Sequence, residues 1–187
     1  MSKWTKIVFT ILTILLGSVC ILAGALLAYS PGEPKPHLDQ TGNKIKGSIS
    51  EKTFVAINGV EQGMVIKSKD ETHPVLLFLH GGMPEYFLNQ KYPNGLEDYF
   101  TVVYCEQRGS GISYKSNSST SEIRLEQMEA DALAVTNFLR NRFNKDKIYI
   151  MAHSGGGFIW IQGVAKAPEL LYAYIGVGQM SNQFESE

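Results

Sequence analysis

The stretch KIYIMAHSGGGF, residues 147–158, constrains the fold of this chain more than any other feature. A run typical of a buried strand ends at Ser154, and glycines then lead into a run typical of a helix. Such a turn strains the serine backbone, and the residues two positions before and after the serine must be very small. Ala152 and Gly156 occupy those positions. The pattern predicts a sharp strand–serine–helix turn that lifts the Ser154 hydroxyl clear of a sheet.

The same turn would place backbone amides where an oxyanion could bind. The amide of Gly155 would lie at the helix N-terminus, aimed at developing negative charge. We expect the second donor, the amide of Gly82, from the loop after PVLLFLHGG. Taken by itself, the A-x-S-x-G pattern fits equally well a glycine-rich turn that only packs a helix against a strand. The flanking strand and helix favour Ser154 as a candidate nucleophile.

After residue 44, strand-like runs alternate with helical ones. The run around NGVEQG predicts a hairpin over about residues 49–67. The sequence predicts buried strands in PVLLFLHGG, YFTVVYC, KIYIMAHS and LYAYIGVG, and helices in TSEIRLEQMEADALAVTNFLRNRF (with a Thr/Ser cap) and GGGFIWIQGVAKAPE. This alternation implies parallel βαβ units, hence an open, mostly parallel α/β sheet with helices on both faces. Ligands bind beyond the carboxyl ends of such strands, where HGGMPE, EQRGSG and HSGGG are expected.

The N-terminus carries the signal for location. Residues 7–29 contain no charge, and at about 1.5 Å per residue this helix would span roughly 35 Å, enough to cross a bilayer core. Lys3 and Lys6 precede it, which predicts a single-pass anchor in the cell membrane with the catalytic domain outside the cytoplasm. A signal peptide cleaved near AGA, giving a secreted protein, is the alternative. We therefore expect an anchor or signal in 1–29, a linker in 30–44 and a domain in 45–187.

Composition argues against several partners. Basic and acidic residues number 17 and 18 and are scattered, so we expect no nucleic-acid binding. Cys20 and Cys105 suit neither an internal disulfide nor a metal site, and the histidines lack H-x-x-x-H spacing. No metal or cofactor is therefore expected.

Several polar side chains are assigned structural or solvated positions from their context. We expect His80 and His153, each beside a glycine at a strand end, to fix loops. His37 lies in the linker region and is expected to be solvated, as is His73. On the long helix, Glu126 and Asp131 are expected to face solvent.

In order, LLFLHGG, EQRGSG and HSGGG resemble the α/β-hydrolase fold and, within it, the proline-iminopeptidase-like branch of serine hydrolases. The resemblance covers about Thr53 to Glu187 and corresponds to the N-terminal portion of that fold. It implies that Ser154 is the nucleophile and that Gly82 and Gly155 supply oxyanion amides. The implied reaction is acyl transfer to water from a small-molecule or peptide substrate.

The chain also departs from the family pattern. Met83 follows Gly82 directly, as though a Pro-Gly pair were missing, and Glu106 stands where an Asp is usual. In this fold the acid and the histidine follow the serine on later strands, and no histidine follows Ser154 here. We therefore expect a membrane-anchored serine hydrolase, peptidase- or iminopeptidase-like, truncated before the cap and last strands and inactive in this form. The alternatives are a non-catalytic tethered binding module and an esterase or lipase of the same fold.

Overall fold

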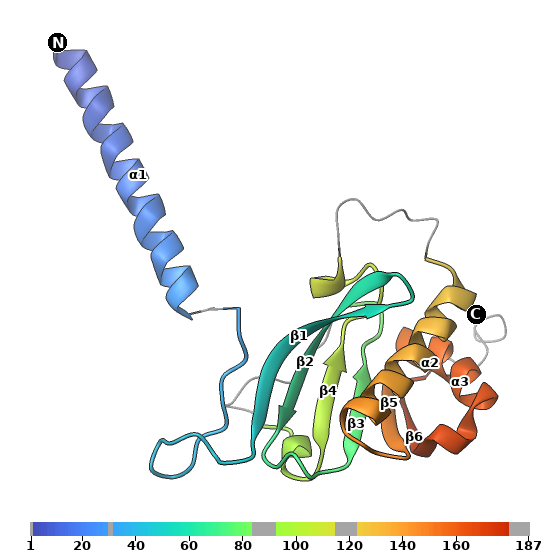
Figure 1. Cartoon of the computed structure of the whole chain (residues 1–187). Helices are drawn as coiled ribbons and strands as arrows, with labels where there is room; N and C mark the ends of the chain where they lie inside the picture. Colours follow the sequence, from blue (N-terminus) through green and yellow to red (C-terminus); the bar gives the residue numbers. More distant parts are fainter. Residues whose placement is uncertain (1, 30–31, 84–92, 115–122, 180–187) are drawn as a thin grey trace. The chain divides into compact units, whose positions relative to one another are not determined.

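The computed structural model describes residues 2–29, 32–83, 93–114 and 123–179. The chain divides into two compact units, Met1–Glu33 and Pro34–Glu187. The first unit holds helix α1, Lys3–Tyr29 (Figure 1). Hydroxyls of Thr10, Thr13 and Ser18 donate to backbone carbonyls four residues earlier, so the helix satisfies them internally. By length and composition α1 can cross a membrane, a test that a signal sequence also passes.

The second unit is built on a mixed sheet with the strand order β1-β2-β4-β3-β5-β6 (Figure 1). The antiparallel pairs are β1 with β2 and β2 with β4, and the remaining neighbours are parallel. This arrangement confirms the mostly parallel α/β sheet expected from the sequence. The strands are β1 Ile49–Ile57, β2 Val60–Ser68, β3 Val75–Leu79, β4 Thr101–Cys105, β5 Ile148–His153 and β6 Leu171–Val177.

A two-residue turn joins β1 to β2. Its central residues, Asn58 and Gly59, have φ values of 46° and 83°. Positive φ at both positions is typical of a type I′ turn, whose twist matches that of the flanking strands. The hairpin predicted around NGVEQG is thus confirmed, with Asn-Gly as its turn.

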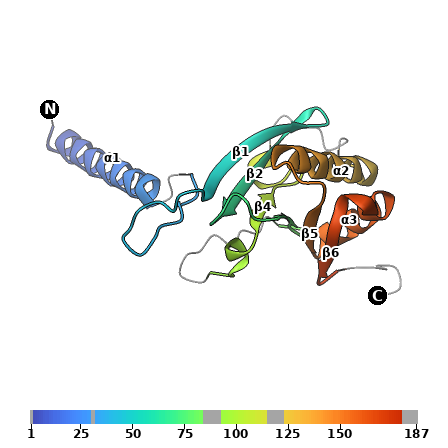
Figure 2. The same ribbon diagram turned by 60° about the horizontal axis from the view of Figure 1, so that its bottom comes forward.

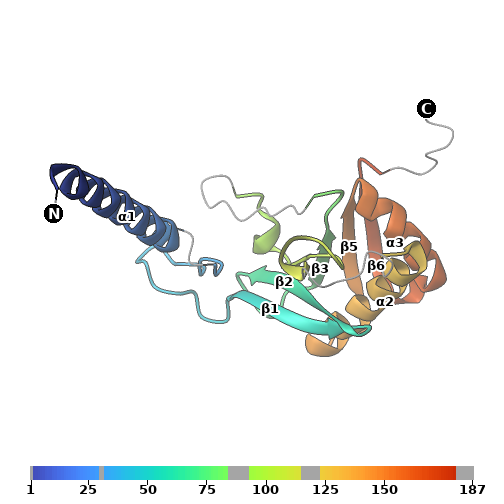
Figure 3. The same cartoon turned by 90° about the horizontal axis from the view of Figure 1, so that it is seen from above.

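Helices α2, Leu125–Arg142, and α3, Gly155–Lys166, pack on the same face of the sheet (Figures 2 and 3). On the other face the buried side chains pack against Leu96 and Phe100, next to a 3₁₀ turn at Leu96–Asp98. The alternation of runs had suggested helices on both faces, but among the described residues α2 and α3 cover the same face. Two further 3₁₀ turns span Gly111–Ser113 and Pro168–Leu170. The main core comprises Ile57, Met64, Ile66, Val75, Leu77, Leu79, Val103, Cys105, Ala132, Val135, Leu139, Ile148, Ile150, Ala152 and Trp160.

Helix α2 begins at Leu125, later than the sequence suggested. Arg124 precedes its first residue in an extended conformation, and the Arg124 side chain makes no cap hydrogen bond. The predicted cap residues lie in 115–122, outside the described residues. Ala132, Val135 and Leu139 are buried against the sheet. Burial of this apolar face accounts for the helix without a cap, because packing outweighs the roughly 1 kcal/mol that a cap contributes.

The stretch before β1, residues 34–48, is part of the second unit and forms a turn. Asp39 accepts hydrogen bonds from the backbone N–H groups of Thr41 and Asn43, which closes a turn, and Leu38 pairs with Lys44. This turn carries His37 into a buried position, 9% exposed. The expectation that His37 is solvated was therefore wrong.

Candidate active site

Ser154 lies in the turn that the sequence predicted. Strand β5 ends at His153, and helix α3 starts at Gly155. Ser154 has a φ of 50°, in the left-handed region that residues with a side chain rarely occupy. Its N–H donates to the carbonyl of Val177 at 2.9 Å, and its carbonyl accepts from the N–H of Gly157 at 2.9 Å. These hydrogen bonds, to β6 on one side and within α3 on the other, hold the strained backbone in place.

Small residues are needed here because β3 passes directly behind the turn. A Cβ on Gly156 would lie 3.0 Å from the carbonyl oxygen of Leu79, and it would also meet the carbonyl oxygen of His80. Two residues before the serine, Ala152 is fully buried. The packing therefore leaves no space for a side chain at Gly156 and explains the short residues on both sides of Ser154.

The loop after β3 contacts the turn from the other side. A Cβ on Gly81 would lie 2.9 Å from the Ser154 Cβ and 3.5 Å from its Oγ. Gly82 follows at once, and its backbone nitrogen lies 4.0 Å from where a Cβ on Gly155 would be. Ser154, Gly155 and Gly82, which the sequence proposed as one site, thus lie together. Pro84 and Glu85, where the loop was expected to be shortened, are outside the described residues.

Sheet topology explains why these two loops meet. From β3 the chain passes to β4 on one side, and later returns to place β5 on the other side of β3. Loops that leave adjacent parallel strands in opposite directions open a crevice at their carboxyl ends, where such sheets bind ligands. Gly81 and Ser154 follow β3 and β5 at this crevice.

His80 anchors the base of the glycine loop, as the sequence suggested. The side chain is 4% exposed, and its Nδ1 lies 2.8 Å from the Gly81 carbonyl oxygen. Its Nε2 accepts a hydrogen bond from the Gln107 N–H at 3.3 Å, and the Gln107 side-chain amide donates to the His80 carbonyl at 2.8 Å. The loops after β3 and β4 are joined through this ring.

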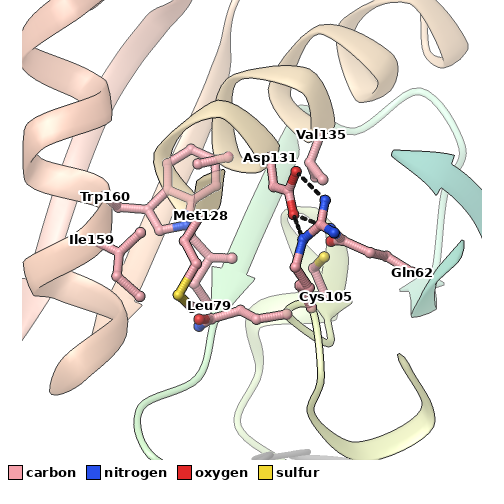
Figure 4. Close-up of a pocket in the computed structure, with 11 residues that line it drawn as sticks. Gln62, Leu79, Cys105, Met128, Asp131, Val135, Ile159 and Trp160 are labelled. Atoms are coloured by element: carbon pink, nitrogen blue, oxygen red, sulfur yellow. Dashed lines mark hydrogen bonds and ion pairs between the residues drawn. The ribbon is translucent and has the colours of Figure 1, made fainter. Parts of the chain in front are cut away.

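The sequence missed a buried ion pair beside this loop. Arg108 Nε donates to the Asp131 carboxylate at 2.8 Å, with a second contact from Nη2 at 3.1 Å. Asp131 also accepts from the side-chain amides of Gln62, at 2.7 Å, and Asn58, at 2.9 Å. Figure 4 shows the Asp131 carboxylate and its contacts with the other residues that line a small pocket between α2, α3 and the end of β4; Asn58 is not drawn.

Asp131 was expected to face solvent, and this was wrong, because the residue is 5% exposed. Glu126, one turn earlier on α2, is exposed as expected. One feature of the sequence could have indicated this burial. Arg108, in EQRGSG, is a cation in the loop after β4, and it pairs with Asp131 on the following helix. Among the described residues no cluster of three or more His, Cys, Asp or Glu is arranged to hold a metal ion.

Comparison with known proteins decides the family. The model of the alpha/beta hydrolase fold family matches residues 74–187. The chain belongs to the α/β-hydrolase fold family. Across 144 residues it is 35% identical to the probable aminopeptidase YbaC of Bacillus subtilis (strain 168), an alignment that covers 76% of this chain and 45% of that protein.

Solved structures agree on the fold of this α/β-hydrolase chain. A proline iminopeptidase-related protein from Thermus thermophilus matches with a TM-score of 0.59 and 24% identity, over 72% of this chain and 46% of that one. An epoxide hydrolase from Vigna radiata matches with a TM-score of 0.55 and 23% identity, over 71% of this chain and 40% of that one. The chain therefore spans between 40% and 46% of the length of these relatives.

Proposed function

We propose that this chain carries the nucleophile-bearing part of a membrane-anchored serine hydrolase, with Ser154 as nucleophile and the amides of Gly82 and Gly155 as oxyanion donors. The observation that supports it most is the strained φ of 50° at Ser154, in a turn that the Gly81–Gly82 loop contacts directly. Strain of this kind persists where the surrounding structure holds it and is concentrated at functional sites. A turn that only packed a helix would need neither the serine nor the adjacent amides.

The proposed reaction is acyl transfer to water. Ser154 Oγ gives its proton to a base and attacks the substrate carbonyl, and the two amides stabilise the resulting oxyanion. The amine or alcohol leaves with a proton, and water then hydrolyses the acyl-serine to a carboxylic acid and free Ser154. A serine is a weak nucleophile without a base to take its proton, and no histidine follows Ser154 in these 187 residues. A complete site requires such a base in addition to Ser154 and the two amides. We propose that these 187 residues by themselves are inactive beyond the slow turnover that binding and the oxyanion amides support.

We propose peptides with a free N-terminus as the first substrates to test, because the relative from Bacillus subtilis is described as a probable aminopeptidase. Esters are the second class. Chemistry that uses a carboxylate nucleophile is disfavoured, since residue 154 is a serine. In this proposal α1 anchors the protein in the cell membrane, residues 30–44 form the linker, and the domain from residue 45 lies outside the cytoplasm, because Lys3 and Lys6 lie at the start of α1, before its uncharged residues 7–29.

The test compares three versions of the protein, expressed from the native gene and purified from membranes: wild type, Ser154→Ala and Ser50→Ala. Ser50 lies on β1 and its hydroxyl donates to the Lys35 carbonyl, so its loss controls for removal of a serine away from the site. We expect Ser154→Ala to lose aminoacyl-nitroanilide or nitrophenyl-ester hydrolysis by roughly three orders of magnitude or more, and Ser50→Ala to keep it. Equal and measurable rates in wild type and Ser154→Ala would contradict the proposal, because the hydrolysis would then not depend on Ser154.

A further inference from the structure

A buried carboxyl group lies beneath the glycine loop, outside the reaction described above. Glu106 follows β4, and its side chain is 1% exposed. Its Oε2 lies 3.7 Å from His80 Nε2 and 3.4 Å from Ser110 Oγ. Its Oε1 is buried and has no hydrogen-bond partner among the described residues. The space is tightly filled, because a Cβ on Gly111 would collide with this carboxyl group.

The contacts of His80 determine which ring nitrogen carries a proton. Nδ1 lies 2.8 Å from the Gly81 carbonyl oxygen, which can only accept, so Nδ1 must donate. Nε2 faces the backbone N–H of Gln107 at 3.3 Å, which can only donate, so Nε2 must accept. The geometry thus describes a neutral imidazole with its proton on Nδ1.

A count of protons then indicates the state of Glu106. The Ser110 hydroxyl has one proton, and it faces three acceptors: the Gln107 carbonyl at 2.9 Å, His80 Nε2 at 3.1 Å and Glu106 Oε2 at 3.4 Å. The carbonyl and Nε2 are both nearer than the carboxyl oxygen, so the hydroxyl proton goes to one of these two acceptors. A carboxylate would then have no donor at either oxygen among these partners, which is costly for a buried charge. A carboxylic acid instead donates its own proton from Oε2 to Ser110 Oγ, which removes the buried charge and keeps the Ser110 proton for the Gln107 carbonyl or His80 Nε2.

We propose that Glu106 is a positioning residue held as a neutral carboxylic acid, and that its O–H, acting through Ser110 and His80, fixes the Gly81–Gly82 loop beside Ser154. The oxyanion-binding role of this loop rests on the proposed function. The protonation of Glu106 and its effect on His80 do not rest on it.

The charges around the carboxyl group give the direction of its pH response. Burial raises the pKa of Glu106 to about 7. His80, after β3, is the titratable group that faces it, while Arg108 in the same loop is paired with Asp131 of α2. When Glu106 ionises, its carboxylate competes for the Ser110 hydroxyl proton. The contact from Ser110 to His80 Nε2 then weakens, so we expect the loop to shift as pH rises through about 7.

The test observes protonation directly in the full chain in detergent micelles. Infrared spectroscopy detects the protonated carboxyl band, and ¹⁵N NMR of labelled histidine reports the His80 tautomer, each below and above pH 7. Variants are Glu106→Gln, which keeps the neutral shape, Glu106→Ala and Glu97→Gln. Glu97 is the matched control, a second partly buried glutamate whose pKa is raised by burial but which contacts Lys67 and not His80.

We expect part of the infrared band of protonated carboxyl groups to be missing in Glu106→Gln. In the wild type the same part should disappear above pH 7. The His80 signal should change with pH in wild type and stay constant in Glu106→Gln, whereas Glu97→Gln should behave as wild type at His80. A band below pH 7 that Glu106→Gln leaves intact would overturn the proposal. The proposal would also be overturned if Glu106→Gln shifted the ¹⁵N signal of His80 as far as Glu106→Ala does. Neither readout depends on Ser154, so an unreactive serine would refute the proposed function and leave this inference standing.

Discussion

Removing the Asp131 carboxylate is the most informative perturbation of stability. The side chains of Arg108 and Asp131 are 8% and 7% exposed, and the carboxylate also accepts from Gln62, which is 1% exposed. Asp131→Ala would leave a buried guanidinium and a buried amide without this acceptor. Removing one partner of such a buried pair costs about 3–5 kcal/mol, because the remaining charge stays desolvated.

This cost should be visible in urea denaturation of the full chain in detergent micelles, followed by the fluorescence of Trp160, which lies in the core. With a slope of about 2 kcal/mol per M, a loss of about 4 kcal/mol lowers the unfolding midpoint by roughly 2 M. Because the other tryptophan, Trp4, is on α1, it should be replaced by Phe in every variant compared.

The control is Glu126→Ala on the same helix, which removes an exposed carboxylate and should change stability by less than about 0.5 kcal/mol. Replacing both partners, as Arg108→Met with Asp131→Ala, should recover roughly half of the loss, since no buried charge remains unpaired. If Asp131→Ala behaves like Glu126→Ala, the carboxylate is solvated and the network described here is wrong.

Three further predictions follow from single contacts. Gly156→Ala should destabilise the chain by about 1–3 kcal/mol and abolish Ser154 acylation, because its Cβ would lie 3.0 Å from the Leu79 carbonyl oxygen; Gly163→Ala in the same helix meets ordinary 3.9 Å contacts and should not. Gly59→Ala should cost about 1 kcal/mol in urea denaturation because Gly59 has a φ of 83°, and an unchanged midpoint would argue against the type I′ turn. Burial and the nearby Lys67 and Lys69 lower the pKa of His37 from 6.5 to about 4. The stability it contributes is complete above pH 6.5 and is lost as pH falls towards 4, so His37→Leu should flatten this acid dependence of the urea midpoint.

Local patterns predicted the features that depend on neighbouring residues. Asn58-Gly59 identified the hairpin because few other pairs adopt positive φ twice. The turn at Ser154 was recognisable because a side chain at Gly156 would collide with the β3 carbonyls. In both cases the residues of the turn itself determine its backbone conformation.

Long-range contacts could not be read in the same way. Asp131 is buried because Arg108 and Gln62 reach it from other elements, 23 and 69 positions away in the sequence. His37 is buried because its segment, turned at Asp39, brings it against Glu97, 60 positions later in the sequence. The start of α2 at Leu125 depends on packing against the sheet and not on a local cap. Partners distant in sequence decide each of these outcomes.

The measurement that tests the central claim most directly is the site of acylation by a reactive nitrophenyl ester, mapped by peptide mass spectrometry on the protein made from its native gene. We predict one acyl group per chain on Ser154, which is lost both in Ser154→Ala and in Gly156→Ala. Acylation spread over other serines and lysines, or unchanged in Ser154→Ala, would show that the strained turn does not present a nucleophile.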